Sequence, residues 1–151
     1  MAKSFDFSNA PGHLIRRAQQ LAVAIFMEET TGFDITPVQF AILTALIEAP
    51  GEDQVTLSSR VAFDAATFGS VIGRLEAKGW VKREADLGDK RRKLLWTTPE
   101  GEKIALQMSQ AVNKAQQRIV EPLELDEQAR LSSLLHKLIE GHQDDAKSKQ
   151  A

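Results

Sequence analysis

Residues 56–98 read TLSSRVAFDAATFGSVIGRLEAKGWVKREADLGDKRRKLLWTT and carry the most informative pattern of the chain. Two helical patterns come first, separated by a short turn at Phe63 and Asp64, and a basic segment interrupted by a glycine follows them. Thr56 is expected to cap the first helix, because a threonine hydroxyl accepts from the unpaired amides of a first helical turn. The buried side of this helix is expected to comprise Leu57, Val61 and Ala62.

The second helix is expected to begin after Asp64, whose carboxylate is a good N-terminal cap. It is expected to end at Gly79, because glycine is the residue that most often follows a helix. Its apolar residues recur at helical spacing and are Phe68, Val71, Ile72 and Leu75. The pattern therefore predicts two closely coupled helices that share one buried side.

The other side of the second helix carries Thr67, Ser70 and Arg74 at positions i, i+3 and i+7. Much of the remaining helix surface carries short side chains that project little, and these are Ala65, Ala66, Gly69 and Gly73. A helix that enters the DNA major groove needs such small residues for close approach, with a few hydroxyl and guanidinium groups for phosphates and base edges. The alternative is a solvated amphipathic helix whose polar side chains face water.

The segment after Gly79 predicts a β-hairpin with strands at residues 81–84 and 94–97. The sequence DLGDKRRK lies between the strands, and its four consecutive cations are Lys90, Arg91, Arg92 and Lys93. A cationic hairpin tip directly after two short helices can reach a phosphate backbone or the minor groove. A charge run in isolation would indicate only a solvated loop.

These residues carry a resemblance to a known family. KGWVKR at residues 78–83, DKR at residues 89–91 and TPEG at residues 98–101 follow the helices in the order typical of the MarR family of winged helix-turn-helix regulators. The family pattern covers residues 74–101, and the flanking helices extend the resemblance over nearly the whole chain. Trp80 and Thr97 stand where the family usually has leucine, which we interpret as local repacking of the hairpin.

The resemblance implies a mainly α fold with a small β-wing. Residues 1–151 would form a single subunit, with a winged helix-turn-helix at about 36–98 and dimerisation helices at about 13–31 and 99–142. It implies a transcriptional repressor, acting as a homodimer on a pseudo-palindromic double-stranded DNA operator, and Asp89 would orient Arg91. The residues expected to contact DNA, or to orient those that do, are Ser58, Ser59, Arg60, Thr67, Ser70, Arg74, Asp89, Lys90, Arg91, Arg92 and Lys93.

The flanking sequence predicts four further helices. A long helix at about residues 13–30 carries a stripe of Leu14, Ala18, Leu21 and Ile25. Thr36, Pro37 and Gln39 open the next helix with a capping box, and a short strand is expected at residues 54–56. Thr98 and Pro99 start a long helix whose apolar stripe comprises Ile104, Met108, Ala111, Ala115 and Ile119.

The last helix, at about residues 126–142, carries Leu131, Leu134, Leu135, Leu138 and Ile139. This is more apolar surface than a lone C-terminal helix can hide, so the sequence favours a homodimer built on the terminal helices. The alternative is packing within one subunit.

Family members of this kind are often released from DNA by aromatic acids. Arg17 lies at the apolar edge of the first helix, and arginine is suited to bidentate carboxylate binding. Which of Arg16 and Arg17 faces inward stays open, and a salt bridge to Glu28 or Glu29 is the alternative to a ligand. The expected ligand-binding set is Arg17, Arg16, His13, Phe40 and Ile25.

The composition of the chain limits the other classes of function that it could have. The chain has 151 residues, a formal net charge of −2 and no cysteine, which excludes disulfides, thiolate metal sites and a cysteine redox switch. It shows no signal peptide or membrane-length apolar run, and a cytoplasmic location is expected. The histidines lack metal-ligand spacing, and we expect no enzyme activity, no catalytic residue and no cofactor. The rival functions are a protein–protein interaction module that uses the basic hairpin, and a DNA-binding regulator without a ligand.

Overall fold

The fold is seen in a computed structural model that describes residues 4–61 and 64–150. The helices are α1 (Pro11–Glu29), α2 (Pro37–Glu48), α3 (Gln54–Arg60), α4 (Ala65–Ala77), α5 (Pro99–Val120) and α6 (Leu125–Gln150). The strands are β1 (Glu52–Asp53), β2 (Val81–Ala85) and β3 (Lys93–Thr97). They form an antiparallel sheet in the order β1-β3-β2, and this confirms the predicted mainly α fold with a small β-wing.

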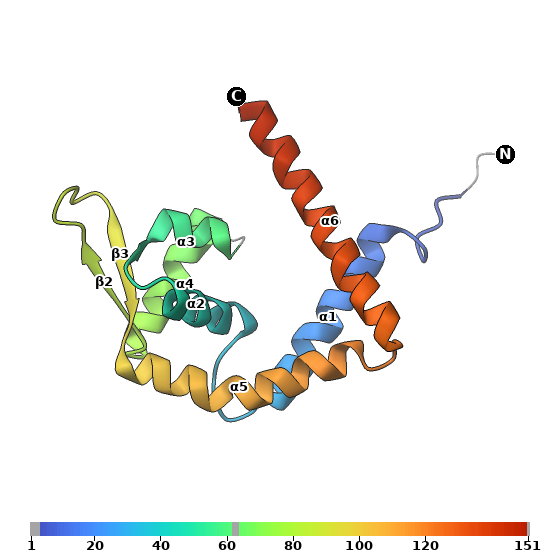
Figure 1. The fold of residues 1–151 in the computed structure, drawn as a ribbon, viewed down its shortest axis with the longest axis horizontal. Helices are drawn as coiled ribbons and strands as arrows, with labels where there is room; N and C mark the ends of the chain where they lie inside the picture. The colour runs from blue at the N-terminus through green and yellow to red at the C-terminus, as the bar shows by residue number, and fades with distance from the viewer. Residues whose placement is uncertain (1–3, 62–63, 151) are drawn as a thin grey trace.

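The elements divide between the two ends of α5 (Figure 1). α2, α3, α4 and the sheet gather at its N-terminal end, while α1 and α6 lie at its C-terminal end. The hairpin of β2 and β3 extends outward beside α3, and α6 projects away from α5. The helix-turn-helix and its wing therefore lie at one end of α5, and the terminal helices lie at the other.

Side-chain caps explain where three helices begin. The Thr36 hydroxyl accepts a hydrogen bond from the Gln39 amide at 3.2 Å, and the Gln39 side chain accepts one from the Thr36 amide at 3.2 Å. This is the predicted capping box, with Pro37 at the first helical position. Asp64 and Thr98 cap α4 and α5, again as predicted.

The start of α3 corrects the prediction that Thr56 is its cap. Asp53 is the cap, because its carboxylate accepts hydrogen bonds from the Thr56 amide at 3.0 Å and the Thr56 hydroxyl at 2.6 Å. Gln54 therefore lies in the helix, and the expected strand at residues 54–56 lies earlier, at Glu52–Asp53, where it pairs with β3. Ala62 and Phe63, which the sequence placed at the end of this helix and in the turn, lie outside the described residues.

The first helix also starts earlier than predicted. It begins at Pro11, two residues before the expected start, because a proline at the first helical position needs no hydrogen bond from its nitrogen.

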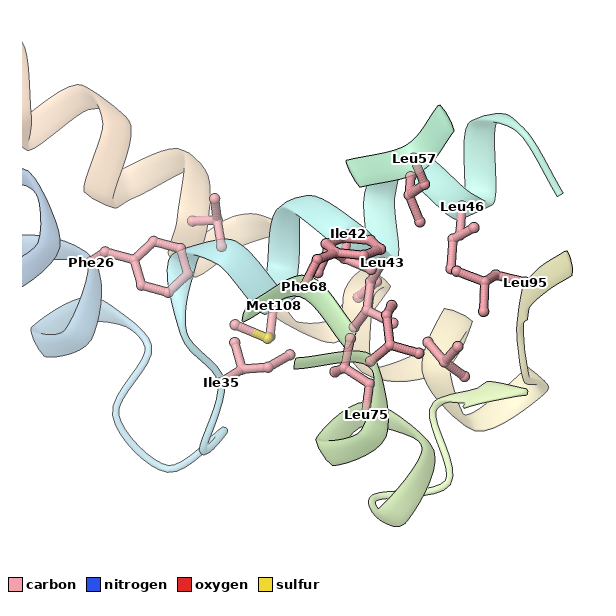
Figure 2. Close-up of a cluster of buried hydrophobic side chains, with 14 residues drawn as sticks. Phe26, Ile35, Ile42, Leu43, Leu46, Leu57, Phe68, Leu75, Leu95 and Met108 are labelled. Atoms are coloured by element: carbon pink, nitrogen blue, oxygen red, sulfur yellow. The ribbon is translucent and has the colours of Figure 1, made fainter. Parts of the chain in front are cut away.

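The core lies between the helix-turn-helix and the start of α5 (Figure 2). Its fully buried side chains include Ile42, Leu43, Leu46, Leu57, Phe68, Ile72, Leu75, Leu95 and Met108. Three of the four predicted apolar positions of α4 are in this group, and Val71 packs against it from a partly buried position. Each such side chain contributes about 1.5–3 kcal/mol by leaving water. The core thus fixes the rotation of α4 and turns its opposite side outward.

The buried stripe of α5 differs from the predicted one. Met108 and Ala115 are buried as expected, but the other buried apolar side chains are Ala105 and Val112. The predicted Ile104, Ala111 and Ile119 are only partly buried. The difference is one helical position, because one side of α5 packs on α2 and the winged region while another packs on α1.

The start of α5 is fastened to the turn after α4. The Thr98 hydroxyl donates to the Gly79 carbonyl at 2.6 Å, and the Thr98 amide donates to the Trp80 carbonyl at 3.0 Å. Gly101 lies directly over that carbonyl, where a Cβ atom would come within 2.1 Å of the Trp80 oxygen. Gly79, with φ of 77°, ends α4 as the sequence predicted.

The two positions that depart from the family pattern lie at the base of the hairpin. Trp80 packs against the core from a partly buried position, with the Lys78 ammonium 4.7 Å from its ring centroid. Thr97 pairs with Val81 across the hairpin. Both observations agree with local repacking.

Ion pairs join α1 to α5. The Arg118 guanidinium donates to Glu29 at 2.7 Å and to Glu28 at 3.0 Å, and Lys114 lies 3.4 Å from Glu29. These contacts, first the hydrogen bond from Arg118, lower the pKa of Glu29 below its ordinary value.

Candidate nucleic-acid interface

The side of α4 that the sequence predicts to meet DNA comprises Thr67, Ser70 and Arg74, all of which are exposed. The core side of the helix explains their position, because Phe68, Ile72 and Leu75 occupy the opposite side. Within the described residues, Arg74 has no ion pair or side-chain hydrogen bond. Its guanidinium is therefore available for a phosphate or for a guanine edge.

The expected phosphate contacts on α3 are only partly presented. Ser58 is 6% exposed, and its hydroxyl donates to the Val55 carbonyl at 2.8 Å, so it does not reach outward. Ser59 and Arg60 are exposed. The Arg60 guanidinium pairs with Glu52 and lies 3.6 Å from Glu48. The sequence could not separate Ser58 from Ser59, because one helical position decides which of them faces the core.

The wing tip presents Arg91 in the arrangement that the family resemblance implied. One Asp89 oxygen accepts hydrogen bonds from the Arg91 backbone amide at 3.1 Å and from its Nε at 3.3 Å. The terminal nitrogens of Arg91 stay free of this contact, and its side chain is 93% exposed. Lys90 and Lys93 are exposed beside it.

Arg92 is arranged differently from its neighbours. Its Nη2 lies 3.3 Å from Asp53 and its Nη1 lies 3.4 Å from Asp86, and its side chain is 53% exposed. Asp53 belongs to the start of α3 and Asp86 to the wing. Hydrogen bonds from Thr56, and then the contact with Arg92, lower the pKa of Asp53.

Sequence reasoning missed that three consecutive residues around the start of α3 each bind a different arginine. Glu52 binds Arg60, Asp53 binds Arg92, and Gln54 accepts a hydrogen bond from Arg83 at 3.1 Å. Arg83 also pairs with Glu76 of α4 at 2.7 Å. The available signal was a polar triplet between a buried helix and a helix-turn-helix that precedes an arginine-rich hairpin.

The five predicted ligand-binding residues do not form one site in the subunit. His13 and Arg16 lie together, with Nδ1 and Nη2 3.0 Å apart. Arg17 is exposed and has no ion pair or hydrogen bond to another side chain within residues 4–61 and 64–150. Phe40 packs on Phe26, 6.3 Å between ring centroids, which is about 20 Å along α1 from His13. Ile25 is partly buried near that same end of α1.

A pocket of about 430 Å³ adjoins the His13 and Arg16 pair. Its lining comprises Phe5, Phe7, Ala10, Pro11, Gly12, His13 and Arg16. The Phe7 ring centroid lies 4.2 Å from that of His13, so an aromatic wall and a cation occur side by side. Phe5 and Phe7, which precede α1, were not assigned to this site from the sequence.

Other kinds of site find no support in the part of the chain that the structure describes. No group of three or more histidine, cysteine, aspartate or glutamate residues there could hold a metal ion. No helix there has the length and apolar character needed to cross a membrane.

Comparisons with known proteins place the interface in context. A family model described as MarR family matches residues 33–92. The transcriptional regulator HosA of Escherichia coli O127:H6 is 30% identical over 131 residues, which cover 87% of this chain and 96% of HosA.

Two solved structures are similar over nearly the whole chain. BpsR of Bordetella bronchiseptica, whose DNA binding is regulated by 6-hydroxynicotinic acid, is 32% identical with a TM-score of 0.85, covering 90% of this chain and 97% of BpsR. A mutant MarR from Escherichia coli, complexed with operator DNA, is 30% identical with a TM-score of 0.82, covering 91% of this chain and 99% of that one.

Proposed function

Because this chain belongs to the MarR family of transcriptional regulators, we propose that it is a homodimeric repressor that binds a pseudo-palindromic DNA operator and is released by a small aromatic acid. The observation that carries the proposal is the exposed side of α4 with Arg74, beside a wing whose tip presents Lys90 and Arg91. Together these surfaces offer groups for the major groove and for the adjoining backbone or minor groove.

The DNA contacts divide into two kinds. Arg74, with Thr67 and Ser70, would read base edges, because arginine can donate two parallel hydrogen bonds to guanine. Lys90 and Arg91 would neutralise phosphates or enter the minor groove, which adds affinity that depends strongly on salt. We expect Arg74→Ala to weaken specific binding more than non-specific binding.

The exposed apolar side chains of the terminal helices support a homodimer. On α1 they include Leu14, Ile15 and Leu21, and on α6 they include Leu134, Leu135, Leu138 and Ile139. α6 projects from the rest of the subunit (Figure 1), and these side chains are exposed there, so a second copy packed on them would remove them from water. A two-fold dimer would present two copies of α4 to two half-sites.

The pocket beside Arg16 is the proposed site for the acid. Arg16 would bind the carboxylate, and the rings of Phe7 and His13 would pack against the aromatic ring. Regulation of the similar BpsR by 6-hydroxynicotinic acid supports this ligand class. Arg16 lines this pocket and Arg17 does not, so we assign the carboxylate to Arg16.

Fluorescence anisotropy tests the proposal with a duplex that the wild-type protein selects from a randomised library. The titration is repeated with benzoate-, cinnamate- and hydroxynicotinate-type acids. Tight, salt-dependent binding that one acid reverses supports the full proposal. Tight binding that no acid disturbs leaves a regulator without this ligand. No preference for duplex DNA contradicts the proposal and favours the interaction-module alternative.

Two neighbouring arginines give a matched test of the ligand site. Arg16→Gln should weaken binding of the acid, because it removes the carboxylate partner. Arg17→Gln makes the same charge change one residue away on an exposed position and should leave acid affinity unchanged. Weaker binding in Arg17→Gln alone would move the site to the other side of α1.

A further inference from the structure

Arg92 connects the wing to the helix-turn-helix through two carboxylates. Nη2 reaches Asp53 at 3.3 Å, and Nη1 reaches Asp86 at 3.4 Å. Asp53 is at the same time the cap of α3, through its hydrogen bonds to Thr56. One guanidinium thus joins the first residue of the helix-turn-helix to the base of the hairpin loop.

Asp86 links Arg92 to the loop of the hairpin. One of its oxygens accepts from the Gly88 amide at 2.9 Å while the other faces Arg92. The loop is closed by backbone hydrogen bonds from the Asp86 amide to the Arg92 carbonyl at 3.0 Å and from the Arg92 amide to the Asp89 carbonyl at 2.9 Å. Asp89 in turn holds Arg91. A continuous chain of polar contacts therefore runs from the start of α3 to the exposed arginine.

The wing needs such a connection because the sheet alone holds it weakly. β2 and β3 are five-residue strands, and β1 contributes only two residues to the sheet. A two-stranded hairpin is marginally stable by itself, so its angle to the helices depends on side-chain contacts. A planar guanidinium that pairs with two fixed carboxylates restricts that angle better than a flexible ammonium would.

We propose that Arg92 is a positioning residue, whose bridge between Asp53 and Asp86 sets the wing at the angle at which Arg91 and Lys90 meet DNA while α4 occupies the groove. The proposal rests on the DNA-binding function proposed above. It differs from the expectation that Arg92, as one of the four cations of the tip, contacts the phosphate backbone or the minor groove directly.

The substitution Asp53→Asn distinguishes a positioning role of Arg92 from direct DNA contact, because the two roles predict opposite changes in DNA affinity. Asparagine caps helices as well as aspartate, so α3 keeps its start while the ion pair to Arg92 is lost. If Arg92 contacts phosphate directly, removing Asp53 frees it and removes a negative charge near DNA, so affinity rises. If Arg92 positions the wing, affinity falls, and we expect about a three- to tenfold loss.

Glu84→Gln is the matched control for the charge change. Glu84 is an exposed acid of the same hairpin that pairs with Lys82 and not with Arg92. Its removal should leave affinity unchanged or raise it slightly, in contrast to Asp53→Asn.

The salt dependence of binding provides a second readout. A phosphate contact contributes about 0.9 to the slope of log affinity against log salt. We expect Lys90→Gln to lower the slope by about this amount, since Lys90 is exposed at the tip. Arg92→Gln should weaken binding with little change in slope, and Arg92→Lys should restore only part of the affinity because an ammonium cannot bridge both acids in the same geometry.

A double-mutant cycle completes the test on the selected duplex. Once Arg92→Gln is present, Asp53→Asn should have little further effect, because both changes break the same contact. Higher affinity in Asp53→Asn, together with a slope in Arg92→Gln that falls as far as in Lys90→Gln, would overturn the proposal. Thermal unfolding of each variant checks that the subunit remains folded.

Hydrogen exchange in the free protein separates this inference from the proposed function. Arg92→Gln should speed exchange of the Asp86 amide about threefold or more, whereas Lys90→Gln should not. If the wild-type protein binds no duplex, the function proposed above fails while this measurement still decides whether Arg92 holds the wing. Equal exchange in the two variants would show that it does not.

Discussion

Gly101→Ala is expected to destabilise the subunit although alanine favours helices. A Cβ atom at this position would lie 2.1 Å from the Trp80 oxygen and 2.9 Å from its carbonyl carbon. Such approaches do not occur below 3.0 Å, so the start of α5 or the Trp80 peptide must move by about 1 Å. The Trp80 oxygen already accepts a 3.0 Å hydrogen bond from the Thr98 amide, and a shift of that size breaks it.

The magnitude follows from three contributions. Overpacking against a rigid backbone costs about 1–3 kcal/mol. Loss of the hydrogen bond costs about 1 kcal/mol more. Alanine is more favourable than glycine in a helix by about 1 kcal/mol, and this offsets part of the loss. The expected net loss is therefore about 2 kcal/mol, which corresponds to a fall in Tm of about 4–8 °C for a subunit of this size.

Gly73→Ala is the control, because Gly73 is also helical but a Cβ atom there would meet nothing within 4 Å. It should stabilise the protein by about 0.5–1 kcal/mol. Both variants are compared with the wild type by urea unfolding at one protein concentration, since association changes apparent stability. A Gly101→Ala variant as stable as Gly73→Ala would refute the packing argument.

Three further predictions concern contacts between helices and between subunits. Thr98→Val should lower the free energy of unfolding by about 1–2 kcal/mol, because it removes the cap of α5 and the hydrogen bond to Gly79. Arg118 lowers the pKa of Glu29, so the stability from this pair is present at neutral pH and is lost as pH falls through the lowered pKa. Glu29→Gln should flatten the decline in urea midpoint between about pH 6 and pH 3. Leu138→Glu should shift sedimentation towards the monomer, whereas wild-type sedimentation as a monomer at micromolar concentration would contradict the homodimer.

Local signals in the sequence were sufficient for most of the fold. Caps such as Thr36 and Asp64, and a glycine after α4, mark helix ends through short-range hydrogen bonds and backbone geometry. The start of α3 was misplaced because Asp53 and Thr56 are both acceptable caps. Only the pairing of β1 with β3 decides between them, and that pairing is long-range.

The candidate site was predictable only as far as residues act through their own element. Arg74 and Arg91 were located correctly on exposed surfaces, because helix phase and hairpin position fix them. The bridge from Arg92 to Asp53 spans 39 residues, so no local pattern reveals it. The five residues expected to bind a ligand are likewise not brought together within one subunit, since Phe40 packs on Phe26 near the end of α1 whereas His13 lies near its start.

The ion pairs also limit how strongly a chain of net charge −2 attracts a polyanionic partner. Arg60, Arg83 and Arg92 are each held by an acid beside the helix-turn-helix, so much of their charge is compensated before DNA arrives. Long-range attraction is therefore weak, and affinity has to come from the few cations that remain presented, among them Arg74 and Lys90. A binder of this kind tolerates little error in position. Small shifts of the wing or of α4 are then enough to change DNA affinity.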